Sequence, residues 1–192
     1  TAAKIYKVPL AEVTSDMRRK AKTANFGIIY GISVFGLAER LQIPRSEAKE
    51  LIDGYFATYP RIKAYMDECI NKARELGYVE TLWGRKRYLP DITSGNSFVR
   101  GFAERNAINA PIQGSAADII KVAMIAIDKA FRQANLRSQM ILQVHDELNF
   151  NVYPDEMDKV KEIVCREMSQ AIQLQVPLIA DCGVGQNWLE AH

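Results

Sequence analysis

The stretch RRKAKTANFGIIYG, residues 18–31, indicates the structure of the first part of the chain. Three candidate N-cap residues, Thr14, Ser15 and Asp16, come just before it, so the sequence predicts a helix from about Met17 to Ile32. Four basic residues crowd the first turns of this helix. Because the helix dipole disfavours positive charge there by about 0.3–1 kcal/mol per cation, a bound anion would compensate.

One stripe on this predicted helix repeats at four-residue intervals: Arg18, Lys22, Phe26 and Tyr30. It is cationic first and aromatic afterwards, which matches a ligand that presents phosphates and then a base. The predicted helix interior also contains Gly27 and Gly31. Each glycine costs about 1 kcal/mol relative to alanine and would allow close approach of a base or another chain. The alternative is a solvated basic turn followed by two aromatic core residues, and spacing alone leaves both open.

Local signals predict further helices and a hairpin up to residue 93. A short helix in GLAERLQIP is expected to stop near Pro44, and Ser46 to cap the next helix in part. Pro60 should open a third helix that ends at Gly77. The flanking stretches YVETL and RKRYL predict a hairpin with a two-residue turn at Trp83-Gly84.

The second part of the chain predicts helices around a hairpin. A helix over 97–108 is expected to end near Pro111, and Ser115 with Asp118 to cap a long, buried helix that reaches about Asn135. Two strands at about 139–152, a helix from about Asp155 to Ile172 and a closing strand in LIADCGVG should follow. Helices and hairpins without regular βαβ alternation favour the α+β class.

A second candidate site lies at the tip of the predicted hairpin, in QVHDELNF, residues 143–150. His145, Asp146 and Glu147 join its two strands. Carboxylate oxygens bind hard cations such as Mg²⁺, and two such ions about 3.5–4 Å apart can activate a hydroxyl and stabilise a leaving oxygen. An Asp-Glu turn is also common in proteins without a metal, so the residues alone leave both interpretations open.

The composition is that of an ordinary globular chain, with an uneven distribution of charge. Residues 1–110 contain 18 Lys and Arg against 12 Asp and Glu, whereas residues 111–192 contain 7 against 11. A basic part beside an acidic part fits a polyanion surface beside a cation site.

The 3 cysteines and 2 histidines do not suggest a disulfide framework or a multi-histidine metal site. Without a long uninterrupted apolar run, we expect a cytoplasmic protein that does not engage a membrane.

Three motifs together resemble the DNA polymerases of family A, of the bacterial DNA polymerase I type. The first stretch matches the family pattern R-x-x-x-K-x-x-x-F-G-x-x-Y-G, and VHDE at residues 144–147 matches the palm motif. In RNAINAPIQGSAADII, polar residues follow one another at four-residue intervals, as in the family: Arg105, Asn109 and Gln113. The resemblance covers essentially the whole chain and implies α+β architecture, with helical fingers over 1–110 and part of a small antiparallel palm sheet over 111–192.

The resemblance also implies roles for individual residues. Arg18 and Lys22 would hold the triphosphate of a deoxynucleoside triphosphate, with Lys22 also a general acid for departing pyrophosphate. Phe26 would pack on the sugar and base, and Tyr30 would lie beside the templating base.

For the other two motifs, the resemblance implies contacts to metal and to primer-template DNA. Asp146 would be a Mg²⁺ ligand, Glu147 a supporting carboxylate and His145 a primer contact. Arg105, Asn109 and Gln113 form what we call the polar triad. Because the minor-groove acceptors are shared by all base pairs, the polar triad would sense pair shape without reading sequence. From the residues alone, Asn109 and Gln113 could instead satisfy backbone groups around Pro111.

The family pattern includes an upstream palm strand with a second metal-binding Asp and a Glu that excludes ribonucleotides. Neither can be assigned in this sequence, so we expect negligible DNA synthesis by the chain alone. An unpaired palm sheet edge would also favour self-association.

Other classes of protein remain as alternatives. GLAERLQIPRSEAKELIDGYF, residues 36–56, has the helix, break and helix of a helix-turn-helix DNA-binding module, although its second helix is acidic. A structural fragment that binds neither nucleotide nor DNA is a further alternative. A single-subunit RNA polymerase shares parts of the architecture, but the close motif matches favour DNA.

Overall fold

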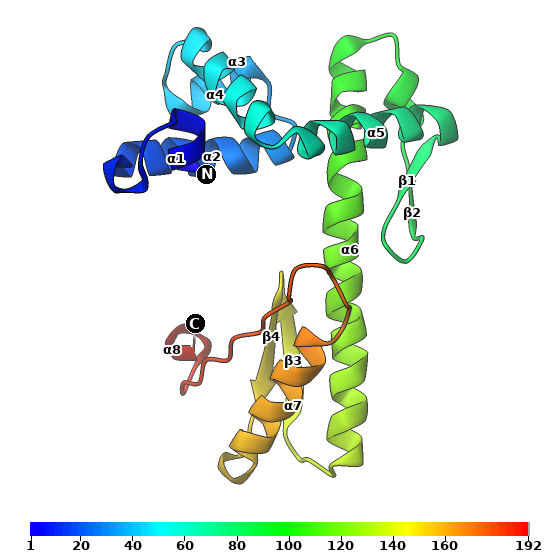
Figure 1. The fold of residues 1–192 in the computed structure, drawn as a ribbon. Helices are drawn as coiled ribbons and strands as arrows, with labels where there is room; N and C mark the ends of the chain where they lie inside the picture. Colours follow the sequence, from blue (N-terminus) through cyan, green and yellow to red (C-terminus); the bar gives the residue numbers. More distant parts are fainter. Residues whose placement is uncertain (192) are drawn as a thin grey trace. The chain divides into compact units, whose positions relative to one another are not determined.

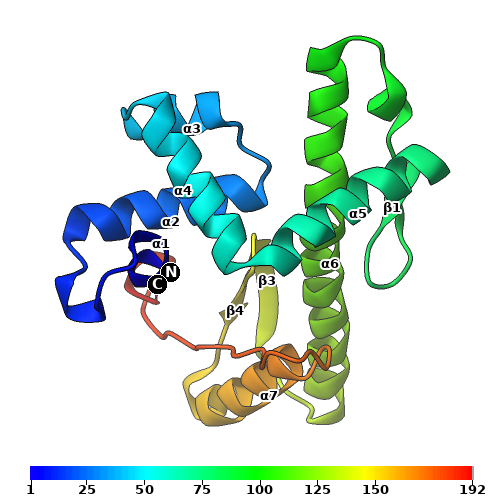
Figure 2. The ribbon, with the colours of Figure 1, turned by 45° about the horizontal axis from the view of Figure 1, so that its top comes forward.

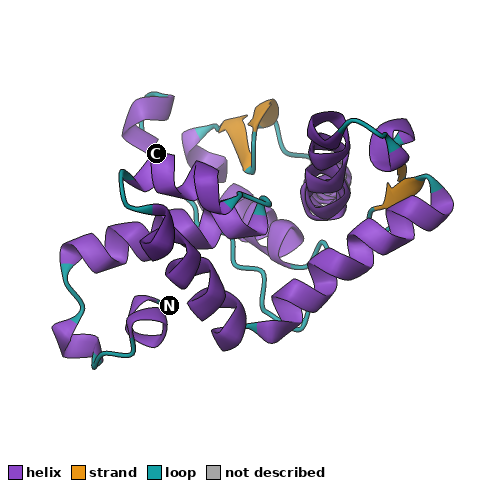
Figure 3. Ribbon diagram, turned by 90° about the horizontal axis from the view of Figure 1, so that it is seen from above, coloured by secondary structure: helices purple, strands orange, loops and turns teal. Residues whose placement is uncertain are grey.

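The computed structural model describes residues 1–191 and divides into two compact units, Thr1–Ile112 and Gln113–His192. Helices dominate, and the strands form two short antiparallel pairs (Figures 1 and 3). The expected α+β class is therefore confirmed.

The first unit begins with four helices (Figure 2), which pack around one apolar cluster. Its buried centre includes Ile28, Leu37, Leu51 and Tyr55. A 3-10 turn at Leu10–Glu12 separates the first two helices, and the helices in chain order are α1 (Ala2–Tyr6), α2 (Ser15–Ile29), α3 (Val34–Leu41) and α4 (Arg45–Thr58). Ser46 lies inside α4 and does not cap it, because Pro44 occupies the N-cap position without a side-chain bond.

Helix α2 begins where a cap was expected and ends earlier than expected. The Thr14 hydroxyl accepts a hydrogen bond of 3.2 Å from the backbone N–H of Met17. At the other end, Gly31 has a φ of 72°, and its N–H bonds the carbonyl of Ile28, while the N–H of Ile32 bonds that of Gly27. These two bonds form a Schellman motif, so Gly31 ends the helix and is not an interior residue.

We expect Gly31→Ala to destabilise the chain by about 2 kcal/mol, since a Cβ there combines a left-handed backbone with overpacking. The added atom would lie 2.9 Å from Cγ of Arg105. The matched control is Gly77→Ala, because Gly77 has a φ of 76° but nothing within 4 Å of its Cβ position. Urea unfolding of both variants checks this, and equal losses would show that the Arg105 contact is unimportant.

Helix α5 (Pro60–Leu76) and a hairpin, β1 (Tyr78–Glu80) with β2 (Lys86–Tyr88), follow in the first unit. Pro60 opens α5 and Gly77 ends it, as predicted. The hairpin turn, however, has three residues and not two. Thr81 pairs with Arg85, and Gly84, with a φ of 76°, bonds the Thr81 carbonyl. A glycine in this conformation favours a three-residue loop over the predicted two-residue turn.

Helix α6 (Ser97–Gln133) is continuous, contrary to the expected break near Pro111. A 3-10 turn at Pro90–Thr93 precedes it. The proline removes one backbone hydrogen bond, but packing holds the helix on both sides of it. Ala103 and Ala107 lie in one apolar cluster, and Ile127 and Phe131 lie in another. The predicted cap residues Ser115 and Asp118 therefore lie inside the helix.

Much of the second half of α6 is exposed, although burial was expected. Ile125 is 71% exposed because only the face with Ala123, Ile127 and Phe131 is covered. Within residues 1–191, α6 is also the one helix long and apolar enough to cross a membrane, with a mean hydropathy of 1.3 over 18 residues, of which 22% are buried. Core helices of globular proteins meet the same criteria, so this finding does not distinguish the two environments.

The second unit packs a hairpin and a helix against the end of α6. Strands β3 (Gln139–Val144) and β4 (Glu147–Asn151) are antiparallel, and α7 (Met157–Ser169) follows a 3-10 turn at Pro154–Glu156. The apolar cluster includes Phe131, Val160 and Ile163, with Phe150 beside Phe131 at 5.7 Å between ring centroids. The hairpin prediction is confirmed, and α7 is shorter than predicted at both ends.

No strand forms at residues 178–185 (LIADCGVG), so the predicted closing strand is wrong here. The only sheet of this unit that the described residues form is β3-β4. A strand requires a hydrogen-bonding neighbour, and none of the described strands pairs with this segment. A short helix, α8 (Trp188–Ala191), follows it. Self-association through a sheet edge stays a prediction.

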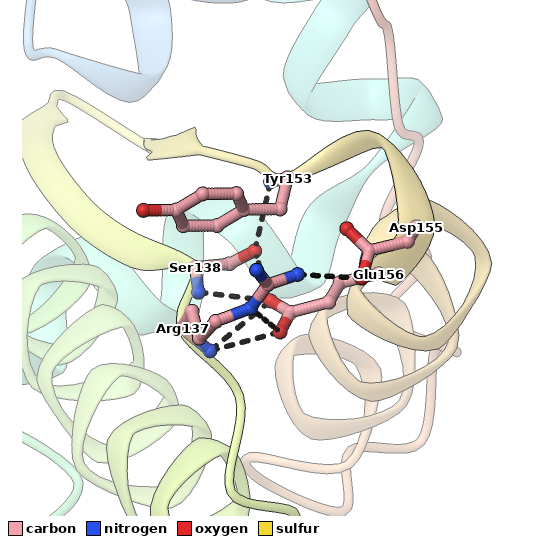
Figure 4. A network of polar contacts seen from close by, with 5 residues as sticks. All are labelled: Arg137, Ser138, Tyr153, Asp155 and Glu156. Carbon is pink, nitrogen blue, oxygen red and sulfur yellow. Dashed lines mark hydrogen bonds and ion pairs between the residues drawn. The ribbon is translucent and has the colours of Figure 1, made fainter.

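A polar network fixes the loop between α6 and β3 to the start of α7 (Figure 4). The Glu156 carboxylate accepts bonds from the backbone N–H of Arg137 at 3.0 Å, from the Ser138 hydroxyl at 2.6 Å and from the Ser138 N–H at 2.9 Å. The Ser138 hydroxyl in turn accepts from the Tyr153 N–H. These donors lower the pKa of Glu156 from 4.5 to about 2. The backbone N–H of Arg137 has the largest effect, and the Ser138 hydroxyl has the next largest.

We expect Glu156→Gln to reduce the loss of folding stability that occurs as the pH falls. The carboxylate contributes stability that is fully present above pH 4.5 and is lost as the pH falls through about 2, because its pKa is lower in the folded state. Thermal unfolding midpoints measured across this pH range check the prediction. Asp158→Asn, an exposed carboxyl on α7, is the control. An unchanged pH dependence in Glu156→Gln would contradict the assignment.

Candidate functional site

The predicted stripe on α2 faces outward along its whole length. Arg18 and Lys22 are exposed, Phe26 is 54% exposed and Tyr30 is 45% exposed. The interpretation of the two aromatic residues as core residues is therefore wrong. Tyr30 lies one position beyond the helix, at its C-cap, but remains on the same stripe.

The opposite face of α2 is held in the core, which fixes the direction of the stripe. Ala21, Ala24, Gly27 and Ile28 are buried there. The buried Tyr55 on α4 donates its hydroxyl to Asn25 Oδ1 at 2.9 Å. Rotation of α2 would break this bond and expose the apolar face, so the stripe is a preformed surface.

The four basic residues at the start of α2 divide into paired and unpaired members. Arg19 bonds Asp16 at 2.8 Å, and Lys20 pairs with Asp16 at 3.4 Å and with Glu47 at 2.9 Å. The hydrogen bond to Glu47 is the main cause of a raised pKa at Lys20, and the bond from Arg19 lowers the pKa of Asp16. These acids offset part of the charge crowding expected from the sequence.

The two cations on the stripe itself, Arg18 and Lys22, form no ion pair within residues 1–191. Arg18 lies in the first turn of the helix, where exposed amides and the dipole favour an anion, and Lys22 lies one turn further along the same face. The structure thus leaves unpaired the two basic side chains that the spacing singled out, and pairs their two neighbours.

Arg105 on α6 lies against the other end of the stripe. Its Cγ would be 2.9 Å from a Cβ at Gly31, and its guanidinium lies 5.9 Å from the ring centroid of Phe102. Arg105 therefore lies beside the chain immediately after Tyr30. Gly31 and the preceding Gly27 leave room for this chain's own Arg105 and Ile32 side chains.

The two other members of the polar triad lie further along α6. The side-chain oxygen of Asn109 is buried and has no hydrogen-bond partner among the described residues. This does not support the alternative that Asn109 satisfies backbone groups around Pro111. Gln113 is exposed. Because the helix is continuous, the four-residue interval places all three triad members within one stripe along α6.

The acidic turn has two residues, His145 and Asp146, between the paired Val144 and Glu147. His145 has a φ of 54°, a conformation that favours glycine, and its carbonyl accepts a bond of 2.6 Å from Gln143 Nε2. Such strain persists where the surroundings hold it, and it is often found at functional sites. The strained turn presents Asp146 at the tip of the hairpin.

The two carboxylates of the turn differ in their surroundings. Asp146 is exposed and has no ion pair within the described chain. Glu147 is half-buried and accepts a hydrogen bond of 3.3 Å from Trp188 Nε1. No cluster of three or more His, Cys, Asp or Glu side chains suited to a metal occurs in residues 1–191. One or two carboxylates together with water and substrate oxygens suffice for Mg²⁺, so these residues fit such an ion.

The whole described chain matches one family of enzymes. Residues 1–190 match the model of DNA polymerase family A. The chain belongs to DNA polymerase family A. It is similar to DNA polymerase I of Caldicellulosiruptor bescii (52% identity over 99% of this chain and 22% of the relative) and of Pseudomonas aeruginosa (52% over 100% and 21%).

The family relationship extends to a solved structure. The polymerase domain of Pol1 from M. smegmatis, in complex with DNA primer-template and dNTP, superposes with a TM-score of 0.94 at 46% identity, over 99% of this chain and 34% of that one. The chain spans about a fifth of the length of the C. bescii and P. aeruginosa DNA polymerases I.

Sequence reasoning did not indicate the bond between Trp188 and Glu147. These residues are 41 positions apart. Neither spacing nor composition indicates that they meet, because the segment before Trp188 has no regular structure.

Proposed function

We propose that this chain supplies the nucleotide-binding helix, the duplex-facing helix and the metal-binding turn of a DNA-directed DNA polymerase. The observation that carries the proposal is the exposed stripe on α2, on which two unpaired cations precede two exposed aromatic rings. In this proposal residues 1–110 are the fingers and residues 111–192 are part of the palm. The M. smegmatis relative was solved with primer-template and dNTP, which supports the same partners for this chain.

On the α2 stripe, Arg18 and Lys22 bind the triphosphate of the incoming deoxynucleotide. Charge-assisted hydrogen bonds from both cations neutralise phosphate oxygens. Phe26 packs on the sugar and base, and Tyr30 lies beside the templating base. Lys22 holds a proton at Nζ that can pass to the departing pyrophosphate.

Residues on α6 and on the hairpin bind the primer-template. Arg105, Asn109 and Gln113 donate to minor-groove acceptors common to all base pairs, which suits an enzyme that copies any sequence. His145 contacts the primer strand.

The acidic turn is the proposed metal site. Asp146 ligates Mg²⁺ and Glu147 supports it beside the primer terminus. When bound, two Mg²⁺ ions activate the primer hydroxyl and stabilise the leaving oxygen. Since the relatives are bacterial DNA polymerases I, we propose the bacterial cytosol as the place of action.

Primer extension by a chimera tests this proposal. Residues 1–192 of this chain replace the matching segment of the P. aeruginosa DNA polymerase I, to which they are 52% identical. We expect template-directed dNTP incorporation well above that of the same polymerase with the segment deleted. A folded chimera that binds primer-template but incorporates nothing would contradict the proposal. The helix-turn-helix alternative predicts a preference for one duplex sequence, which binding to randomised duplexes would reveal.

A further inference from the structure

A hydrogen bond connects the chain's C-terminal segment to the acidic turn. Trp188 Nε1 donates to Glu147 Oε2 at 3.3 Å, although 41 residues separate them. Residues 178–187 between α7 and α8 form no helix or strand. The bond therefore joins the first residue of α8 to the first residue of β4, which is next to Asp146.

Local hydrogen bonds fix the backbone that carries Trp188. The Asn187 side chain accepts from the backbone N–H of Glu190 at 3.1 Å and donates to Glu190 Oε1 at 2.7 Å. Glu190 Oε2 in turn accepts from the Gln186 N–H at 3.0 Å. These reciprocal bonds resemble a capping box and fix the start of α8. The backbone at Trp188 is thus held by Asn187 and Glu190, independently of Glu147.

The Trp188 bond restrains the Glu147 carboxylate. The carboxylate is only half-buried, and each hydrogen bond that it accepts limits rotation about its side-chain bonds. An indole N–H can donate but cannot accept. It therefore restrains the carboxylate while leaving its negative charge in place.

We propose that Trp188 is a positioning residue that holds the Glu147 carboxylate beside Asp146 for nucleotide incorporation. This inference rests on the proposed polymerase function. Trp188 itself touches neither substrate nor metal. Its effect should appear in the rate of incorporation and not in nucleotide affinity, because Glu147 is the proposed supporting carboxylate and not a proposed nucleotide-binding residue.

Steady-state kinetics of the chimera test this role. We expect Trp188→Phe to lower kcat about 3- to 10-fold, as for a partly exposed bond to a charged group, and to change KM for dNTP by less than about twofold. The matched control is Trp83→Phe, the other tryptophan of the chain, in the β1–β2 turn. A loss in KM alone, or no loss in kcat, would overturn the proposal.

A double-variant cycle separates positioning from general structural damage. If Trp188 acts through Glu147, Trp188→Phe should cause no further loss of kcat in a Glu147→Ala background, which lacks the acceptor. Independent, multiplicative losses would overturn the proposal. If the chimera with native residues is inactive, the proposed function fails first, and the contact is then judged by fluorescence.

Fluorescence provides a readout that does not depend on activity. In the 192-residue chain with Trp83→Phe, Trp188 is the remaining tryptophan. We expect Glu147→Ala to change its emission maximum and its quenching by acrylamide, because the acceptor of the indole N–H is removed. Asp158→Ala should leave both unchanged. Identical spectra for Glu147→Ala and its parent would show that the contact is absent in solution and would overturn the proposal.

Discussion

Replacing Asp146 with asparagine in the chimera is expected to lower kcat for dNTP incorporation by about 10³-fold, with little change in KM. Metal-assisted charge stabilisation contributes several kcal/mol to a transition state, and each factor of ten in rate corresponds to about 1.4 kcal/mol. Asp146 is exposed at a strained turn and has no ion pair in the described chain. Its carboxylate is therefore available to a metal, and the structure shows no ion pair that the substitution would break. Single-turnover primer extension at saturating dNTP measures the effect.

The matched control for this substitution is Asp158→Asn on α7. Asp158 is also exposed, and it lies outside the acidic turn. It should leave kcat unchanged. Activity of Asp146→Asn within about tenfold of the parent would contradict the assignment of Asp146 as the metal ligand.

Replacing Lys22 with alanine is expected to lower kcat/KM for dNTP by about 100-fold. A hydrogen bond to a charged group contributes about 1.5–3 kcal/mol, and loss of the proposed proton donor adds to the effect. Lys22 forms no ion pair among residues 1–191, so its charge is available to a phosphate. Steady-state primer extension with varied dNTP measures the change.

Arg19→Ala is the control for Lys22→Ala, because it removes a cation from the same helical turn. Arg19 already bonds Asp16, so its removal should change kcat/KM by less than about threefold. Equal losses from both substitutions would mean that general positive charge, and not the stripe, binds the nucleotide.

Signals that act within a few residues were sufficient to predict much of the fold. The Thr14 cap, the proline that opens α5 and the glycine that ends it are local backbone preferences, and the structure has each of them. Other local signals failed. Pro44 occupies the N-cap position of α4 in place of the cap expected at Ser46, and Ser115 and Asp118 lie inside α6.

Features that depend on distant packing could not be predicted in this way. The helix continues through Pro111 because apolar clusters hold it on both sides. LIADCGVG has the composition of a strand but no described neighbour to pair with. A sequence pattern shows what a segment prefers and does not show which partner it meets.

At the candidate site too, local spacing could be predicted from the sequence and tertiary contacts could not. Spacing was enough to place Arg18, Lys22, Phe26 and Tyr30 on one stripe, because helical geometry is regular. It could not show that Asp16 and Glu47 neutralise Arg19 and Lys20, or that Trp188 reaches Glu147. Those contacts join residues through tertiary structure, and they decide which charges remain available to a ligand.

Equilibrium dNTP binding to the 192-residue chain, at fixed salt and Mg²⁺, tests the central claim most directly. The parent chain is compared with Lys22→Ala, Phe26→Ala and Arg19→Ala, each first shown to be folded by circular dichroism. The α2 stripe predicts weak binding that Lys22→Ala and Phe26→Ala both reduce and that Arg19→Ala leaves nearly unchanged. Binding by a folded parent chain that none of the three substitutions alters, or no binding at all, would contradict the nucleotide site on α2.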